Sequence, residues 1–290
     1  MIGSGLIFIA YQILKSKPYQ FLEHLMLAFS LAGQALIAWA CFTLVGVNFN
    51  LFPWLIILVI QSLLSVLMPH YVHRVCSAFF ACIALIICLH YLHLTFIASA
   101  SLLLLVHFLV LNEWRHVKWQ PAFEAISYGI ILLLISFKAS YALGYDVYYW
   151  FGEASQTRTW IDYLDELLLL VAMLYLVITL MKRSQHHFSQ LQQMIMIGTT
   201  ICLCLLSMQA SGITIGFALL ILGFSNSNKI LKGLGMVSLL FYISSYYYLL
   251  ALTLLEKAGI LLFIGMFILA ARFILLKYFK PSQQGENDAI

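Results

Sequence analysis

The sequence predicts an all-α protein that crosses a membrane many times, and two observations carry this prediction. The chain of 290 residues is 63% hydrophobic and only 9% charged, which is far less charge than a soluble domain of this length carries. Its basic residues also recur at alternate connections between apolar stretches, which is the positive-inside pattern of helical membrane proteins. The predicted fold class is therefore a polytopic transmembrane helical bundle.

About 11 spans are expected, because a bilayer core of roughly 30 Å needs about 20 helical residues. The stretches cover 2–14, 25–46, 51–68, 72–92, 94–112, 121–144, 161–181, 191–208, 211–225, 230–253 and 257–279. The first and the ninth are short, so they are half-helices, spans of a thin membrane, or spans lengthened by their flanks. Residues 1–280 then form a single transmembrane helical domain, and residues 281–290 form a polar cytoplasmic tail.

Lysine and arginine fall almost entirely on one side of these spans. Eleven of the 15 basic residues lie in the tail or in the connections after the first, third, fifth, seventh and ninth spans. The opposite connections hold only Arg158 and Lys257, while Lys138 and Arg272 lie within spans. By the positive-inside rule, the N-terminus is outside and the C-terminus is cytoplasmic.

Several function classes are disfavoured by what the chain lacks. The net charge of +4 is spread over loops, so no nucleic-acid partner is expected and the lipid bilayer is the expected surrounding. The six cysteines lie in apolar stretches without a CxxC pair, which indicates neither a disulfide framework nor a zinc ribbon. The motifs HExxH and GxSG, a Walker loop and paired intramembrane aspartates of the GxGD type are missing, so an enzyme of the familiar membrane-hydrolase kinds is disfavoured.

The sixth predicted span carries two ionisable residues, and such groups cost about 2.5–3.5 kcal/mol each within a membrane on insertion scales. Glu124 and Lys138 are 14 residues apart, so they share a helix face with Tyr128 but differ in height by about 21 Å. Lys138 lies towards the outer end, at a depth similar to that of Asp165 and Glu166. An ion pair of Lys138 with one of these carboxylates is the favoured interpretation, and snorkelling of Lys138 to the interface is the alternative.

Three acidic residues open the seventh span. Asp162, Asp165 and Glu166 have the spacing i, i+3, i+4, which places them on one helix face. Carboxylates at a helix N-terminus can cap free N–H groups and interact favourably with the helix dipole. The alternative is an acidic outer mouth for a cation or a basic partner.

Other polar residues within spans suggest local contacts. Arg272 lies near the cytoplasmic end of the last span, where it can either snorkel or pair with Glu124, Glu23 or Glu113. His107, Gln34 and Gln61 are expected to take part in hydrogen bonds between helices.

Two histidine pairs, His70 with His73 and His90 with His93, flank the fourth span at opposite ends and do not form one metal site. His73 and His90 are 17 residues apart, or about 26 Å along a helix. His90 and His93 share the outer side with the acidic cluster. A metal site there would consist of these two histidines and one carboxylate. Since no further ligand supports it, the sequence predicts no metal and no cofactor.

The longest connection, about 145–160, is expected on the outer side. Its aromatic residues suit the membrane interface, so it is either an interfacial segment or a docking loop for a partner. Lys257 lies in a short outer turn, against the positive-inside trend, and is a candidate to pair with the outer carboxylates.

The C-terminal stretch FYISSYYYLLALTLLEKAGILLFIGMFILAARFIL resembles the end of an uncharacterised family of bacterial inner-membrane proteins, the domain of unknown function numbered forty-four-oh-one. The matching positions are Tyr246, Tyr247, Leu254, Leu255, Lys257, Gly265 and Arg272, whereas Ala258 stands where that family usually has serine. The resemblance implies a multi-pass protein of the bacterial inner membrane and a small membrane-anchored protein partner on the outer side. It implies no activity and no catalytic residue.

Three functions remain open at the level of sequence. A scaffold or assembly subunit for an outer-side partner is favoured; the alternative is a transporter or channel for a small solute or ion, with a path lined by Glu124, Tyr128 and Lys138. An enzyme that acts on a lipid-linked substrate is the third. A scaffold predicts that Lys138 and Glu124 are sealed in ion pairs, a transporter predicts that they line a hydrated cavity, and an enzyme predicts convergence of outer histidines and carboxylates.

Overall fold

The computed structural model describes residues 2–16, 19–45, 51–113, 119–143, 145, 160–184, 189–208, 211–249 and 253–278. Within these ranges every regular element is a helix, which confirms the all-α prediction. The helices are α1 (Ile2–Lys15), α2 (Gln20–Val45), α3 (Leu51–Leu67), α4 (Tyr71–Tyr91), η1 (Thr95–Ile97), α5 (Ala98–Asn112), α6 (Gln120–Ala142), α8 (Trp160–Arg183), α9 (Gln190–Ser207), α10 (Ile213–Ser225), α11 (Lys229–Leu249) and α12 (Leu254–Tyr278).

Each predicted apolar stretch coincides with a helix, and the boundary that differs most is the start of α2. This helix begins at Gln20 rather than at residue 25. Glu23 lies in its first turn, and its carboxylate is 3.2 Å from Nε2 of His70. The polar contact extends the helix beyond its apolar part, where hydropathy alone gives no signal.

Six helical segments in the described part of the chain are long and apolar enough to cross a membrane. They are Gln20–Thr43, Tyr71–Tyr91, Thr95–Asn112, Gln120–Ala142, Tyr163–Arg183 and Lys229–Tyr248, whereas α1, α3, α9 and α10 are apolar but shorter. A helix of 20 residues spans about 30 Å, the thickness of the hydrocarbon core. By length and composition, these six helices are those of a membrane protein.

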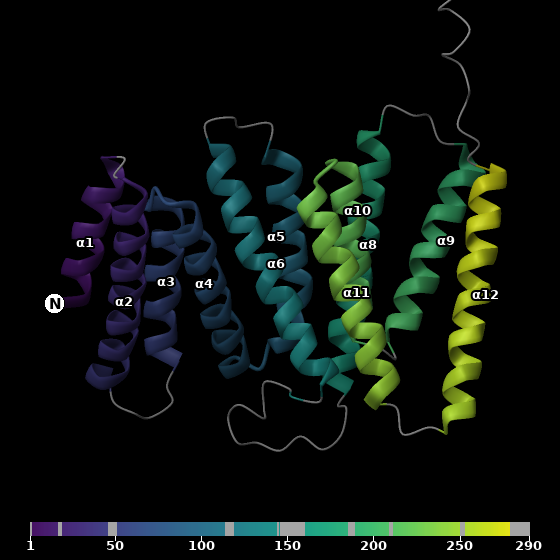
Figure 1. Cartoon of the computed structure of the whole chain (residues 1–290). Coiled ribbons are helices and arrows are strands. Elements are labelled where there is room, and N and C mark those ends of the chain that lie inside the picture. Colours follow the sequence, from purple (N-terminus) through teal and green to yellow (C-terminus); the bar gives the residue numbers. More distant parts are fainter. Residues whose placement is uncertain are drawn as a thin grey trace, which may run out of the picture.

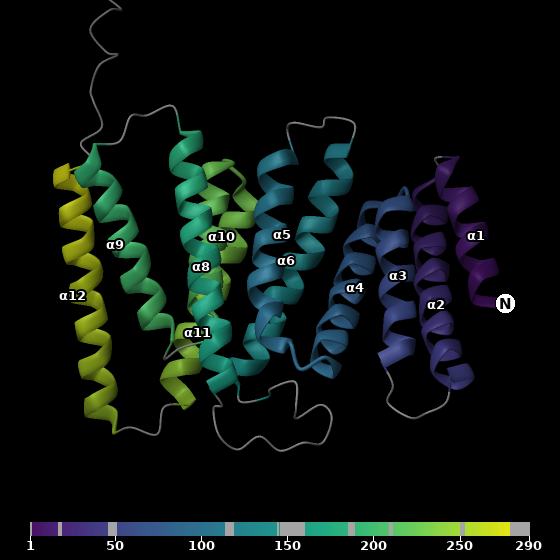
Figure 2. The ribbon, with the colours of Figure 1, turned by 180° about the vertical axis from the view of Figure 1, so that it is seen from behind.

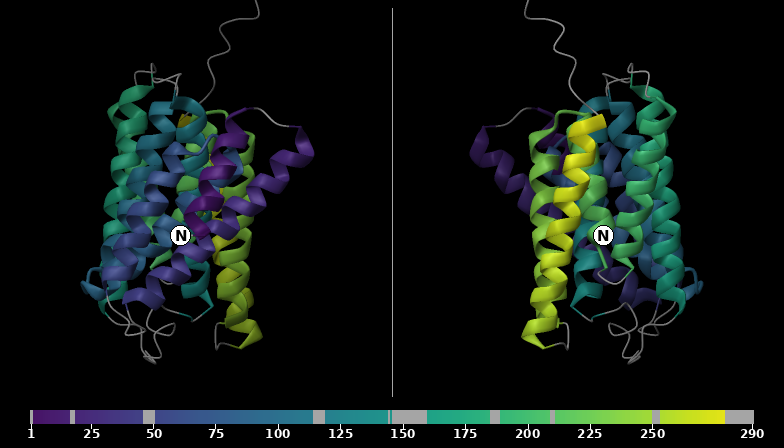
Figure 3. Two further views of the ribbon diagram at one scale, coloured as in Figure 1. Left: turned by 90° about the vertical axis from the view of Figure 1, so that its left-hand side faces the viewer. Right: turned by 90° about the vertical axis from the view of Figure 1, so that its right-hand side faces the viewer.

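The helices lie side by side in one bundle, with neighbours in sequence running in opposite directions (Figures 1 and 2). Helices α1 to α4 form one end of the row, α9 and α12 lie at the other end, and α5, α6, α8, α10 and α11 lie between them. Views along the row show most helices standing upright, whereas α2 is inclined across them (Figure 3).

One end of the bundle, upper in Figure 1, collects the C-terminal ends of α1, α3, α5, α8 and α10 and the N-terminal ends of α2, α4, α6, α9 and α11. We call it the basic end because the helix ends there carry Lys15, Arg74, Lys182, Arg183, Lys229 and Lys232. The alternation of charge along the sequence therefore corresponds to one end of the three-dimensional bundle.

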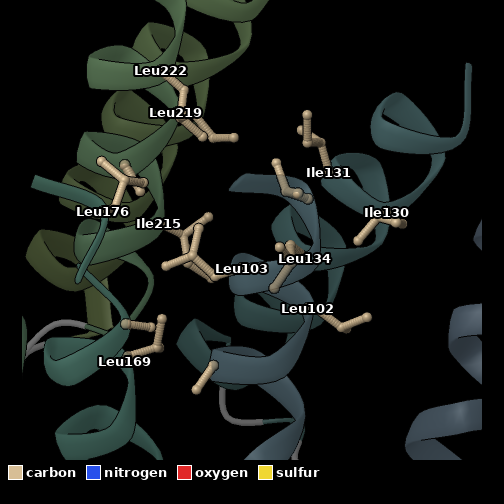
Figure 4. Packing of buried hydrophobic residues seen from close by; sticks show 14 of the residues in the cluster. Leu102, Leu103, Ile130, Ile131, Leu134, Leu169, Leu176, Ile215, Leu219 and Leu222 are labelled. Atoms are coloured by element: carbon tan, nitrogen blue, oxygen red, sulfur yellow. The ribbon is translucent and has the colours of Figure 1, made fainter. Parts of the chain in front are cut away.

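The main core lies where α5, α6, α8 and α10 meet. Leu103 and Leu134 are fully buried, as are Leu169, Leu176 and Ile215. Figure 4 shows these side chains pointing towards one another from four different helices. A smaller cluster of Ala10, Leu14 and Met26 joins α1 to α2. The central helices therefore form the main packed core of the molecule, and the candidate site adjoins it.

Glycines set the closest helix approaches. Gly212 and Gly216, which form a GxxxG pattern, face Tyr242 and Leu239 of α11, where an added Cβ would lie within 2.5 and 2.6 Å of side-chain atoms. Gly212 precedes α10 with a φ of 97°, a conformation that glycine adopts at no steric cost. The pattern accordingly marks a close contact between α10 and α11.

Candidate functional site

The candidate site is a buried trio of charged side chains formed by Lys138 of α6 and Asp165 and Glu166 of α8. The Nζ of Lys138 lies 2.6 Å from Oδ2 of Asp165 and 2.7 Å from Oε1 of Glu166. Lys138 is only 1% exposed, and the two acidic residues are 9% and 4% exposed. The predicted ion pair is thus present, but the lysine pairs with both carboxylates rather than with one.

Two serine hydroxyls from other parts of the fold complete the trio. Ser99, near the start of α5, donates a hydrogen bond of 3.1 Å to Oδ2 of Asp165. Ser211, just before α10, donates one of 3.2 Å to Oε1 of Glu166. Lys138 also lies 5.8 Å from the ring centre of Tyr141, one turn later in α6, within range of a cation–π interaction. The trio therefore ties α6 and α8 to the beginnings of α5 and α10.

The trio contains one basic group and two carboxyl groups. One ammonium group faces two carboxyl groups, and the remaining oxygens, Oδ1 of Asp165 and Oε2 of Glu166, are buried without a hydrogen-bond partner among the described residues. Unpartnered charge is expensive at such depth. The trio is therefore a point where one further proton or cation would be electrostatically favoured.

Tyr242 fixes the surroundings of the trio from α11. It is 1% exposed, and its hydroxyl donates a 3.0 Å hydrogen bond to the carbonyl oxygen of Ile135, on the turn before Lys138. Its ring packs on Gly212, next to Ser211. Tyr242 thus contacts the backbone at two points beside the trio, at Ile135 of α6 and at Gly212 before α10.

The capping interpretation of the acidic residues is wrong for Asp165 and Glu166. Helix α8 begins at Trp160, so these two residues lie beyond its first turn, where free N–H groups occur. Their carboxylates instead face Lys138. The side chain of Asp162 lies outside the described residues.

The polar stripe of α6 is divided between separate contacts. Tyr128 is buried, and its hydroxyl lies 2.9 Å from Nδ2 and 3.2 Å from Oδ1 of Asn228. Asn228 in turn caps α11, since its Oδ1 accepts hydrogen bonds from the backbone N–H groups of Ile230 and Leu231. Glu124 lies nearer the basic end, is half-buried and has no ion pair with a described residue, so of the two ion pairs expected for a scaffold the structure contains only that of Lys138. Tyr128 therefore joins a helix cap, and Lys138 joins the trio.

Two of the three acidic residues expected as partners of Arg272, Glu23 and Glu113, contact other side chains. Glu23 pairs with His70, while Glu113 accepts a 3.4 Å hydrogen bond from Gln120. Burial raises the pKa of Glu113, and the nearby Glu124 carboxylate raises it further, against the effect of Gln120. Arg272 is exposed on α12 and has no ion pair with any described acidic residue. The ion pair considered for Arg272 is therefore absent from the described part of the chain.

The predicted interior polar residues do not form one network. Gln34 lies 2.8 Å from Nε2 of His73 and 2.8 Å from the hydroxyl of Ser77, which joins α2 to α4. His107 packs edge-on to Tyr175, with ring centres 5.6 Å apart. His73, which the sequence presents as one member of a histidine pair, is thus fully buried and forms a hydrogen bond from α4 to α2.

The outer-side candidates form no metal-binding group within the described part of the chain. His90 lies in the last turn of α4, and His93 follows the helix with a φ of 56°, while Tyr246 and Tyr247 are half-buried near the end of α11. No group of three histidine, cysteine, aspartate or glutamate residues suited to a metal ion occurs among the residues searched. The side chain of Lys257 and nearly all of the 145–160 connection lie outside the described residues.

Ser99, Ser211 and Asn228 are the residues that sequence reasoning missed. Isolated serines within or beside apolar stretches carry no signal of their own, because a hydroxyl can also bond to its own helix backbone. The available signal was the pair of carboxylates opposite one lysine, which demands additional hydrogen-bond donors.

Comparison with known proteins gives one result. The family model described as "Domain of unknown function (DUF4401)" matches residues 1–278, nearly the whole chain. No curated protein and no solved structure matches significantly.

Proposed function

Because the chain belongs to this family of unknown function, we propose its role from the site alone: a scaffold or assembly subunit that holds a partner on the outer side of a bacterial inner membrane. The proposal includes a bundle of eleven crossings, with the N-terminus outside and the basic end in the cytoplasm. The alternation of basic helix ends supports this orientation. The expected partner is a membrane-anchored protein that reaches the outer end of the bundle.

The single observation that carries this proposal is the sealed state of Lys138. Its ammonium group is bonded to two carboxylates and is almost completely excluded from solvent. A scaffold needs such rigid ion pairs, whereas a path for solutes needs polar groups that face water. Because the trio lies within two turns of the ends of α6 and α8, it also fixes the two helix ends that flank the 145–160 connection.

A transporter is the second candidate, and the unbalanced charge of the trio favours it. A site with one ammonium and two carboxyl groups can gain a proton or release it without rearranging the helices. The path first considered, from Glu124 through Tyr128 to Lys138, is less well supported, since Tyr128 is engaged by Asn228. A transporter therefore requires the trio to open towards at least one side.

The scaffold proposal predicts a specific neighbour at the outer end. A photo-crosslinking amino acid placed at single positions of 146–158, in cells that express the full chain, is expected to give one discrete adduct of constant mass. The same residue at Ser184 or Ser189, at the basic end, serves as the control and should not give that adduct. Diffuse or missing adducts from every outer position, with the protein present at its normal level, would exclude an outer-side scaffold.

A further inference from the structure

The surface between α5 and α8 contains a long groove. Its volume is about 720 Å³, and it is lined by side chains of both helices, from Ile97 at one end to Asn112 and Arg183 at the other. These limits are about 15 helical residues apart, or roughly 22 Å. One leaflet of the hydrocarbon core is about 15 Å thick, so the groove is long enough for a complete acyl chain.

The wall of the groove is apolar although several polar residues line it. The hydroxyl of Ser101 donates to the carbonyl oxygen of Ala98, that of Thr179 donates to Tyr175, and the amide of Asn112 donates to Phe108. Each of these side chains is therefore bonded to its own helix. The surface left for an occupant is mainly hydrocarbon and aromatic, including Leu104 and Phe108, and its remaining polar side chain before the basic end is His107, whose ring packs on Tyr175.

A positively charged side chain lines the basic end of the groove. Arg183, the last residue of α8, donates from Nη1 to the carbonyl oxygen of Leu111, 2.5 Å away, near the end of α5. That bond holds the guanidinium against the wall of the groove and uses one of its five N–H donors. Arginine binds phosphate through paired N–H groups. Lys182, the neighbouring basic residue, is exposed and is not part of the groove wall.

We propose that this groove binds one glycerophospholipid, with its phosphate on Arg183 and one acyl chain lying between α5 and α8. The order of groups matches that of a lipid in a leaflet: a cation at the helix ends, then about 22 Å of apolar wall. The site lies on the side of α8 where Val171 and Tyr175 are exposed, so lipid can enter it from the bilayer. The inference does not depend on the scaffold role.

The test uses the full chain, purified and incubated with phosphatidylglycerol, and counts retained lipid by native mass spectrometry. Arg183→Gln is expected to lower retention of the first lipid about fivefold, the effect of one basic group near a phosphate surface. Lys182→Gln, its matched control, should retain the lipid like the unmodified protein. Equal retention by the two variants would overturn the proposal.

A second pair of variants tests the acyl-chain part. Ser101→Trp places a large side chain within the groove, whereas Leu105→Trp places it on an exposed part of α5 outside the groove. Loss of the retained lipid in Ser101→Trp but not in Leu105→Trp is expected. Retention of the lipid by both tryptophan variants would show that the phosphate is held without the groove and would also overturn the proposal. Unchanged thermal unfolding of the four variants verifies that each is folded.

Discussion

Replacement of Lys138 by methionine is expected to lower the free energy of unfolding by about 3–5 kcal/mol, the usual cost of removing one partner from a buried ion pair. The methionine fills a similar volume but leaves the carboxylates of Asp165 and Glu166 facing each other without a cation. Both acidic residues are buried, so solvent cannot replace the ammonium group. Reversible unfolding in mixed micelles with increasing dodecyl sulfate measures the change.

The charge count of the trio predicts a marked asymmetry between its members. Asp165→Asn or Glu166→Gln leaves one ammonium opposite one carboxylate, so each is expected to change stability by no more than about 1.5 kcal/mol. The triple variant, in which Lys138→Met is combined with both amide substitutions, should recover much of the loss caused by Lys138→Met alone. Equal losses in all three single variants would contradict the proposed charge imbalance.

Replacement of Gly129 by alanine is the second change expected to have a large effect. A Cβ at this position would lie 2.5 Å from the carbonyl oxygen of Val75, 2.7 Å from Cβ of Ala78 and 3.1 Å from the backbone nitrogen of Phe79. Because two of these atoms belong to the backbone of α4, no side-chain rotation relieves the overlap, and α4 and α6 must move apart. We expect a loss of about 1–3 kcal/mol, as for other overpacked cores.

Gly198 provides the matched control. It lies within α9, and a Cβ added there meets no atom within 4 Å. Gly198→Ala is therefore expected to stabilise the protein by up to about 1 kcal/mol through helix propensity. The two variants are compared by thermal unfolding in lipid nanodiscs of one composition. If the Gly129→Ala protein is as stable as the Gly198→Ala protein, α4 and α6 do not approach each other closely at Gly129.

The helices and the main ion pair could be predicted from the sequence because each depends on a local or a one-dimensional pattern. Apolar stretches separated by polar connections locate α1 to α12, and the depths of Lys138, Asp165 and Glu166 follow from counting residues along two antiparallel helices. The pairing follows because a charge within a membrane needs a partner.

The remaining contacts could not be predicted, because they depend on how each helix is rotated about its axis. In a water-soluble bundle, an apolar stripe indicates the buried face. Here lipid-facing and core-facing residues are equally apolar: Leu103 is fully buried and its neighbour Leu104 is 38% exposed. The contacts of Ser99 with Asp165 and of Asn228 with Tyr128 could therefore not be predicted, and neither could the choice between an ion pair and snorkelling for Arg272.

The most direct test of the sealed trio is water access to α6. Single cysteines replace Ile131 and Ile135, which lie on the stripe between Tyr128 and Lys138, in a background without the six native cysteines. A membrane-impermeant thiol reagent is applied from each side, with positive controls in the 146–158 segment and at Ser184. We predict labelling of each control from one side only and protection of both interior positions. Labelling of residue 131 or 135 from either side would contradict the sealed interior and favour a transport path.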